Sequence, residues 1–265
     1  MAEEINASDL KPHVPHPARV YDYWLGGKDN FAADREVAQK TLVVAPETAS
    51  SVRSNRAFLR RAVRLAAQAG IQQFLDIGSG LPTMENTHEV ARGAVADARV
   101  VYVDNDPMVS VHGRALLARD GSTTVVQADV RDPDSILQHG DVRRLIDFDR
   151  PVALLLLGII HFVPDGDDPY RIVERLREAI TPGSYLIFTH LTGDADPVKA
   201  EEAMDVWRQS PGTPPTLRNR TQAERFFDGF DILEPGIVPP DKWRPEPDTE
   251  DPERFWLWAG VGVKK

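Results

Sequence analysis

Short apolar runs and amphipathic segments alternate along most of the chain. Five runs are rich in apolar residues and end in a turn signal or a polar cluster, as strands do. The predicted strands are Gln73–Ile77, Arg99–Asp104, Thr123–Asp129, Val152–Ile160 and Tyr185–His190. Other segments carry apolar residues three or four positions apart, which predicts helices. These helices are Arg56–Ala69, Val109–Arg119 and Pro169–Ile180. The alternation predicts a parallel, doubly wound α/β sheet with right-handed crossovers.

The C-terminal part departs from this alternation. Two further predicted strands, Phe230–Val238 and Arg254–Val263, follow each other with only a proline-rich segment between them. Successive strands without an intervening helix predict an antiparallel addition at one edge of the sheet. The expected fold is an α/β sheet of seven strands, mostly parallel, with an antiparallel C-terminal edge strand and helices on both faces. Residues 1–55 are expected to form an N-terminal helical extension to a main domain of residues 56–265.

Composition narrows the classes of partner. Lys and Arg number 31 and Asp and Glu 41, so the formal net charge is −10. This balance disfavours nucleic acid and anionic membranes as partners, because phosphate contacts need clustered cations. The chain has no cysteine, which excludes cysteine-based metal sites, and its histidines lack a metal-ligand spacing. The polar N-terminus and the shortness of the longest apolar run predict a cytoplasmic protein without a membrane span.

An open α/β sheet binds ligands beyond the carboxyl ends of its strands. After the first strand comes the loop Gly78-Ser79-Gly80, whose two glycines let the backbone approach a ligand closely. The loop lacks the third glycine of a dinucleotide-binding fingerprint, and Asp76 would place a negative charge beside a pyrophosphate. A ligand with an ammonium or sulfonium group suits this loop better.

Two further carboxylates are predicted at the same edge of the sheet. Asp104 ends the second strand 24 residues after Gly80, a spacing at which an acidic side chain can accept hydrogen bonds from both ribose hydroxyls. Asp129 ends the third strand and could accept a hydrogen bond from an adenine amino group. Each aspartate alone is equally well interpreted as a helix cap. Three in order along one edge favour a cationic adenosine ligand such as S-adenosylmethionine (SAM).

The motifs at these strand ends resemble a known series. FLDIGSG at 74–80, YVDNDP at 102–107 and ADVRDP at 128–133 are similar to the motifs of class I SAM-dependent methyltransferases. More narrowly, PARVYDYWLGGKDNF at 17–31 and LLLGIIHFVPD at 155–165 resemble a family of S-adenosyl methyltransferase-like proteins frequent in actinobacteria. The resemblance implies a Rossmann-like fold, SAM as cofactor, S-adenosylhomocysteine (SAH) as product and a methyl acceptor that it does not identify.

The resemblance also implies roles for individual residues. Asp76, Gly78, Ser79 and Gly80 would line the methionine and ribose of SAM. Asp104 and Asn105 would hold the ribose hydroxyls, and Asp129 and Val130 would frame the adenine. Gly158 and His161 would border the sulfonium and its methyl group. Pro82 departs from the family motif, where many members keep a glycine, and this puts the contacts of the loop in doubt.

The segment around Gly26-Gly27 allows two interpretations. It forms either a surface helix capped by the two glycines, or a lid hinged at them, with the Arg19 or Lys28 cation facing the SAM carboxylate. His161, just after the central strand, is a candidate general base or orienter of the acceptor, and a packing role is the alternative. His190 is a second candidate. Trp207 and the segment 210–215 would either shape an acceptor pocket or serve as a plain connector.

These patterns favour a SAM-dependent methyltransferase that acts on a small molecule. The alternative is a SAM-binding or nucleotide-binding sensor or scaffold without catalysis. An NAD-dependent oxidoreductase is disfavoured by the missing third glycine and by Asp76. Trp256 and Trp258 alternate on the last predicted strand and would serve the core or the surface of a homodimer.

Overall fold

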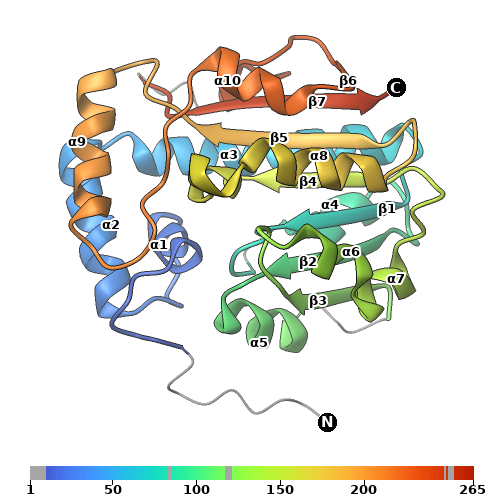
Figure 1. Ribbon diagram of the computed structural model, residues 1–265, viewed down its shortest axis with the longest axis horizontal. Coiled ribbons are helices and arrows are strands. Elements are labelled where there is room, and N and C mark those ends of the chain that lie inside the picture. Colours follow the sequence, from blue (N-terminus) through green and yellow to red (C-terminus); the bar gives the residue numbers. More distant parts are fainter. Residues whose placement is uncertain (1–9, 83–84, 117–120, 248, 250–253) are drawn as a thin grey trace.

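A seven-stranded sheet forms the centre of the protein (Figure 1). A computed structural model describes residues 10–82, 85–116, 121–247, 249 and 254–265. The strands are β1 (Gln73–Ile77), β2 (Arg99–Asp104), β3 (Thr123–Gln127), β4 (Ala153–Leu157), β5 (Tyr185–Leu191), β6 (Phe230–Ile232) and β7 (Leu257–Lys264). Their order is β3-β2-β1-β4-β5-β7-β6, with β7 antiparallel to both of its neighbours and the other pairs parallel. The expected fold class is therefore confirmed, although β6 rather than the last strand occupies the edge.

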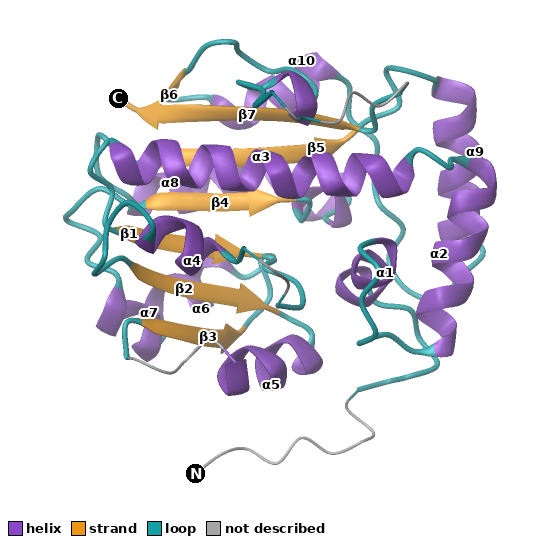
Figure 2. Cartoon of the chain, turned by 180° about the vertical axis from the view of Figure 1, so that it is seen from behind, coloured by secondary structure: helices purple, strands orange, loops and turns teal. Residues whose placement is uncertain are grey.

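Helices cover both faces of this sheet, because side chains of each strand alternate between the faces. Phe74 packs into the cluster on one face and Leu75 into the cluster on the other. The first face carries α3 (Thr48–Gln68), α4 (Thr87–Arg92) and α5 (Pro107–Leu116), and α3 runs across the front of the sheet in Figure 2. The second face carries α6 (Pro133–Gln138), α7 (Gly140–Leu145) and α8 (Pro169–Ala179), and the short α10 (Arg220–Glu224) lies beside β6 and β7.

A third group of helices lies beyond the carboxyl ends of the parallel strands. These are α1 (Pro17–Trp24), α2 (Ala32–Val44) and α9 (Pro197–Arg208), at the left of Figure 1. They share an apolar cluster that contains Val20, Val37, Met204 and Trp207. These three helices therefore lie opposite the edge of the sheet at which ligands bind in this class of fold. The domain boundary expected at residue 55 falls inside α3, which begins at Thr48.

Two predicted strands are much shorter in the structure than their apolar runs, and the strands predicted at 123–129 and 254–263 shorten only at one end. The run 152–160 gives a strand of five residues, because Gly158 turns the chain at a φ of +71° and Ile160 enters a 3-10 helix with its side chain in the core. The predicted strand 230–238 ends at Ile232, before the turn at Pro235-Gly236, and only Val238 returns to bridge β7. Apolar residues in both segments are buried without being in strands.

The packing of α5 on β3 yields a test of the core. A Cβ added at Gly113 of α5 would lie 2.7 Å from Cγ2 of Val125, whereas one at the exposed Gly140 meets nothing within 4 Å. We expect Gly113→Val to lower the free energy of unfolding by about 2–3 kcal/mol through overpacking. Gly140→Val should change it by less than about 0.5 kcal/mol. Urea unfolding followed by circular dichroism measures both, and equal losses would contradict the packing described here.

Candidate active site

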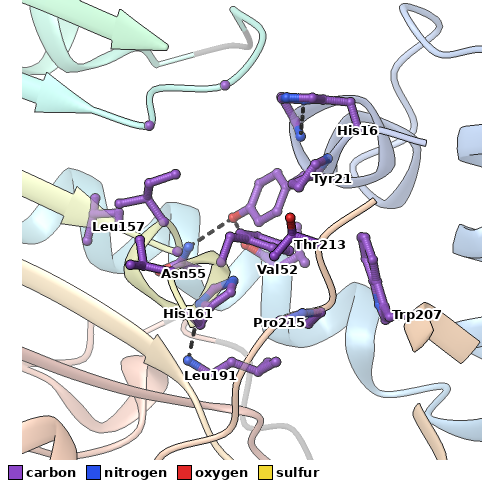
Figure 3. Close-up of a pocket in the computed structure, with 18 of the residues that line it drawn as sticks. His16, Tyr21, Val52, Asn55, Leu157, His161, Leu191, Trp207, Thr213 and Pro215 are labelled. Atoms are coloured by element: carbon purple, nitrogen blue, oxygen red, sulfur yellow. Dashed lines mark hydrogen bonds between the residues drawn. The ribbon is translucent and has the colours of Figure 1, made fainter. Parts of the chain in front are cut away.

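A cavity of about 420 Å³ lies between the carboxyl edge of the sheet and the α1, α2 and α9 group. Every site residue predicted from the sequence lines this cavity except Arg19, Lys28 and the second histidine candidate, His190. The lining residues among them are Asp76, Gly78, Ser79, Gly80, Asp104, Asn105, Asp129, Val130, Gly158 and His161. The opposite wall comes from α1, α3, α9 and the segment 212–217 (Figure 3). The topology therefore brings together residues spread over most of the chain.

Asp104 braces the glycine loop after β1. Its Oδ2 accepts a hydrogen bond from the backbone N–H of Gly80 at 2.8 Å, and its Oδ1 accepts one from Asp106 at 3.0 Å. Gly80 adopts a φ of +67°, and a Cβ built there meets no atom of the described residues within 4 Å, so the backbone borders space that these residues leave open. Burial raises the pKa of Asp104, and the nearby His16 opposes this shift. The carboxylate is thus fixed in place and keeps further lone pairs for a ligand's hydroxyl groups.

Asp76 is the most deeply placed carboxylate of the site. It lies in β1, is 4% exposed, and accepts a hydrogen bond from the hydroxyl of Thr87 at 2.6 Å. Burial raises its pKa to about 6, although Thr87 and the positive charge of Arg56 act in the opposite direction. Arg56 lines the same cavity. A cation bound beside Asp76 would favour its charged form.

Asp129 already accepts several hydrogen bonds from its neighbours. Arg131 donates from its backbone N–H and from Nε, each at 2.9 Å, and also from Nη2, while Asn105 donates from Nδ2 at 3.2 Å. Burial raises the pKa of Asp129, but these hydrogen bonds outweigh it and lower the pKa to about 2. The expected direct contact of Asp129 with an adenine amino group would have to displace one of these donors. Asp129 and Arg131 both lie in the sequence DVR at 129–131, so their pairing could have been predicted.

Arg19 does not face the cavity as the lid hypothesis required. Its side chain is 3% exposed and donates to the backbone carbonyls of Leu10 and Val14. Its Nε lies 3.4 Å from Asp34 Oδ2 and 3.5 Å from Asp106 Oδ2. A buried cation between two carboxylates is already paired, so it is not presented to a cofactor carboxylate. Arg19 instead joins the N-terminal segment to the end of β2.

His16 makes the second link between the N-terminal segment and β2. Its Nδ1 lies 3.1 Å from Asp106 Oδ2, and its Nε2 lies 3.2 Å from Asn105 Oδ1. Its backbone N–H donates to Asp34 at 2.8 Å. His16 lines the cavity, a position that sequence reasoning missed because histidine 16 precedes the motif at 17–31. The segment thereby closes one side of the cavity.

The two glycines that follow α1 form a tight cap. Gly26 adopts a φ of +81°, and a Cβ on Gly27 would lie 1.9 Å from Asp22 Oδ1. Asp22 also accepts hydrogen bonds from the backbone of Asp29 and the side chain of Asn30. This close packing matches the capped-helix interpretation of the segment. It offers no support for a hinge at these glycines.

His161 follows the turn after β4, and the residue as a whole is 7% exposed. Its Nδ1 accepts a hydrogen bond from the backbone N–H of Leu191 at 3.3 Å, as Figure 3 shows. Burial lowers its pKa well below the ordinary value, and His190 and Arg218 lower it further. The ring is therefore neutral, with its proton on Nε2. A hydrogen-bond donor in this position suits a residue that orients the acceptor. A general base would need a free lone pair, and that of Nδ1 is already used in the hydrogen bond from Leu191.

His190 belongs to a buried structural network. It is 0% exposed, its Nδ1 donates to the carbonyl of Leu191 at 2.8 Å, and its Nε2 accepts from Arg218 at 2.8 Å. Burial is the main cause that lowers its pKa to about 3. Both ring nitrogens are in use, so His190 is not a second catalytic candidate.

Sequence reasoning also missed a polar pair at the centre of the cavity. Tyr21 of α1 donates its hydroxyl proton to the carbonyl of Val52 at 3.2 Å. Asn55 of α3 donates from Nδ2 to the same hydroxyl oxygen at 3.0 Å (Figure 3). The polar residues Ser51 and Asn55 face the cavity one helical turn apart, and this spacing was the available signal.

Among the described residues, no group of three or more His, Asp or Glu side chains is placed to hold a metal ion. Within the same residues, no helix is long and apolar enough to span a membrane.

The fold and the carboxylate-lined edge define a Rossmann-like nucleotide-binding protein of the methyltransferase type. A family model described as S-adenosyl methyltransferase matches residues 3–265. The chain therefore belongs to this family, whose members use SAM as cofactor. No curated protein matches the chain in a sequence comparison.

Solved structures agree with the family assignment. A DUF574 family protein from Streptomyces avermitilis is 40% identical, with a TM-score of 0.92 over 97% of this chain and 100% of its own. A candidate methyltransferase from Thermobifida fusca is 48% identical, with a TM-score of 0.90 over 97% of each chain. The N-methyltransferase NodS from Bradyrhizobium japonicum, solved with SAH, is 12% identical with a TM-score of 0.51 over 93% of this chain and 98% of its own. This last likeness shows the fold alone.

The pairing of Arg19 gives a prediction about stability. Arg19→Met leaves the buried carboxylates of Asp34 and Asp106 without their cation. We expect the free energy of unfolding at pH 7 to fall by about 3–5 kcal/mol, as for a buried ion pair that loses one partner. Arg208→Met serves as control, because Arg208 pairs with Glu201 and Asp205 at the surface, where such pairs stabilise little. A loss no larger than that of the control would refute the role given to Arg19.

Proposed function

We propose that this chain is an active methyltransferase that binds SAM along the carboxyl ends of β1, β2 and β3 and methylates a small molecule. The observation that carries the proposal is the braced loop at Gly80. The backbone there borders open space, and the Asp104 carboxylate holds it beside the cavity. A fixed carboxylate at the end of the second strand is the group that accepts the two ribose hydroxyls in nucleotide-binding sheets.

Other lining residues supply partners for the amino-acid end of SAM. We place the ammonium group near Asp76, whose carboxylate lies deep in the cavity, and the carboxylate near Arg56. Arg56 takes the role that the sequence had suggested for Arg19. The backbone around Val130 and the Asp129–Arg131 pair would frame the adenine. The residues present thus offer a partner of suitable charge to each end of the cofactor.

Methyl transfer from SAM requires little acid–base catalysis from the protein. Bound SAM supplies a methyl group already activated by its sulfonium sulfur, and transfer leaves the neutral thioether SAH. The chain must mainly hold the acceptor in line with the methyl group, and such positioning can contribute on the order of 7–11 kcal/mol. His161, neutral and with its N–H on Nε2, would donate a hydrogen bond that orients the acceptor. The proton of the acceptor would pass to water.

A direct assay tests the activity. Methyl-labelled SAM incubated with the protein and a metabolite extract should yield label in a small molecule. In a melting experiment, SAM and SAH should stabilise the protein and NAD should not, because only a ligand that prefers the native state raises the melting temperature. Asp104→Ala should abolish the stabilisation by SAH. Stabilisation by SAH with no transfer to any pool would favour the non-catalytic sensor instead.

The raised pKa of Asp76 predicts that cofactor binding depends on pH. Asp76 is protonated below its pKa of about 6, and an ammonium group prefers the charged carboxylate. SAH should therefore bind about tenfold more weakly at pH 5 than at pH 7.5, since one proton must be released. Titration calorimetry measures this. Asp76→Asn should bind SAH weakly with a flat profile between these pH values, and an unchanged slope in the variant would place the titrating group elsewhere.

A further inference from the structure

The cavity has a second part that the proposed cofactor contacts leave open. Its walls come from α1, α9 and the segment 212–217, which face the end of β4 (Figure 3). The lining side chains there are Trp24, Phe162, Met204, Trp207, Pro215 and Leu217. In the described chain, the lining residues of α9 and of 212–217 include no charged side chain. This part of the cavity, here called the apolar chamber, suits an uncharged ligand, because a charge without a partner is costly to bury.

Aromatic rings give the apolar chamber flat walls. The ring centroid of Trp207 lies 5.7 Å from that of Phe162 and 6.5 Å from that of Trp24, at interplanar angles of 58° and 68°. Phe162 lies in turn 4.5 Å from the ring of His161. Tilted aromatic surfaces of this kind bind the face or edge of another ring. The shape and chemistry of the walls therefore favour an aromatic ligand.

Among the described residues, two cavity-lining side chains carry a buried polar atom without a hydrogen-bond partner, Oδ1 of Asn55 and Nε1 of Trp256. Asn55 is 4% exposed, and its Oδ1 has no hydrogen-bond partner in the part of the chain that the structure describes. The orientation of this amide is fixed by Tyr21, whose single hydroxyl proton goes to Val52, so the hydroxyl oxygen must accept from Nδ2 of Asn55. The oxygen of the amide is therefore directed away from Tyr21. An unpaired buried acceptor is costly. Because this oxygen has almost no accessible surface, a ligand donor would remove that cost after a small rotation of the Asn55 side chain toward the cavity.

Asn55 lies close to the point where the methyl group would be transferred. Its Nδ2 is 3.8 Å from a Cβ built on Gly158, and His161 Cε1 is 3.7 Å from the same point. Asn55 and His161 thus flank the end of β4 from two sides, although the amide nitrogen of Asn55, and not its oxygen, is the atom near that point. For a ligand bound there, Asn55 would supply the unpaired acceptor oxygen and His161 the donor N–H. A hydroxyl group, which both donates and accepts, satisfies the two together.

We propose that the methyl acceptor is an uncharged aromatic small molecule whose hydroxyl group donates a hydrogen bond to Oδ1 of Asn55 while the ring lies in the apolar chamber. On transfer, the O–CH₃ bond would form as the S–CH₃ bond breaks, and the hydroxyl proton would pass to water. This inference rests on the proposed function, because it assumes that SAM occupies the other part of the cavity. Asn55 would then be a specificity-determining residue that selects the hydroxyl and turns its oxygen toward the methyl group.

Matched probes test the proposal on the full-length protein saturated with SAH. The probes are 1-naphthol and 2-naphthol, their methyl ethers, which lack the donor, and 2-naphthoate, which is an anion. Calorimetry should show at least one naphthol binding about tenfold more tightly than its ether, as expected for one buried hydrogen bond, and naphthoate should bind more weakly than either. In Asn55→Leu the ratio of naphthol to ether affinity should fall to near one, with SAH affinity unchanged within twofold. Trp207→Leu should weaken naphthol and ether by the same factor and so preserve their ratio.

Each contrary result has a distinct meaning. Equal affinity for naphthols and ethers, or a preference for naphthoate, with normal SAH binding would overturn this inference and leave the proposed function intact. Weakened SAH binding in Asn55→Leu would assign Asn55 to the cofactor and also overturn the inference. Failure of the unmodified protein to bind SAH would overturn the proposed function, and the inference with it.

Discussion

The carboxylates at the end of β2 hold together the two segments on which the cavity depends. Asp104 accepts the backbone N–H of Gly80 and so fixes the loop after β1. Asp106, two residues later, lies against His16 and Arg19 and so fixes the N-terminal segment. Both carboxylates are nearly buried, where hydrogen bonds and ion pairs are stronger but leave little tolerance for an unpaired group. A single strand end therefore sets the distance between the loop and the segment that faces it.

Burial also decides the chemistry of the two histidines near β4 and β5. Both rings are neutral, and Arg218 beside His190 adds to the effect of burial. In His190 both nitrogens are used within the protein, whereas in His161 only Nδ1 has a partner among the described residues. The same residue type thus serves the core in one case and faces the cavity in the other. The difference arises from hydrogen-bond partners that lie 28 to 30 residues away in sequence.

The sequence predicted the sheet better than it predicted the site. Apolar runs locate all seven strands, because a strand covered on both faces needs continuous apolar residues. The helix that begins at Thr48 was expected only from Arg56, since its first two turns carry polar residues on the buried face. Those residues face a cavity rather than the core, so apolar periodicity cannot reveal them. Arg19 was assigned to the cofactor because nothing local indicates that Asp34 and Asp106 converge on it.

The electrostatic basis of cofactor selection differs from the one expected for three adjacent aspartates. Two of the three carboxylates have a cationic side chain nearby: Arg56 acts on Asp76, and Arg131 pairs with Asp129. The edge of the sheet therefore carries much less net negative charge than its aspartates alone suggest. Attraction of a cation by the net charge of this edge is thus weaker than three unpaired aspartates would give. The directions of the hydrogen bonds therefore contribute to specificity. The acceptor oxygens of Asp76 and Asp104 are fixed in place, and the backbone loop is held beside the cavity. These groups recognise the arrangement of donors on the ligand rather than its total charge.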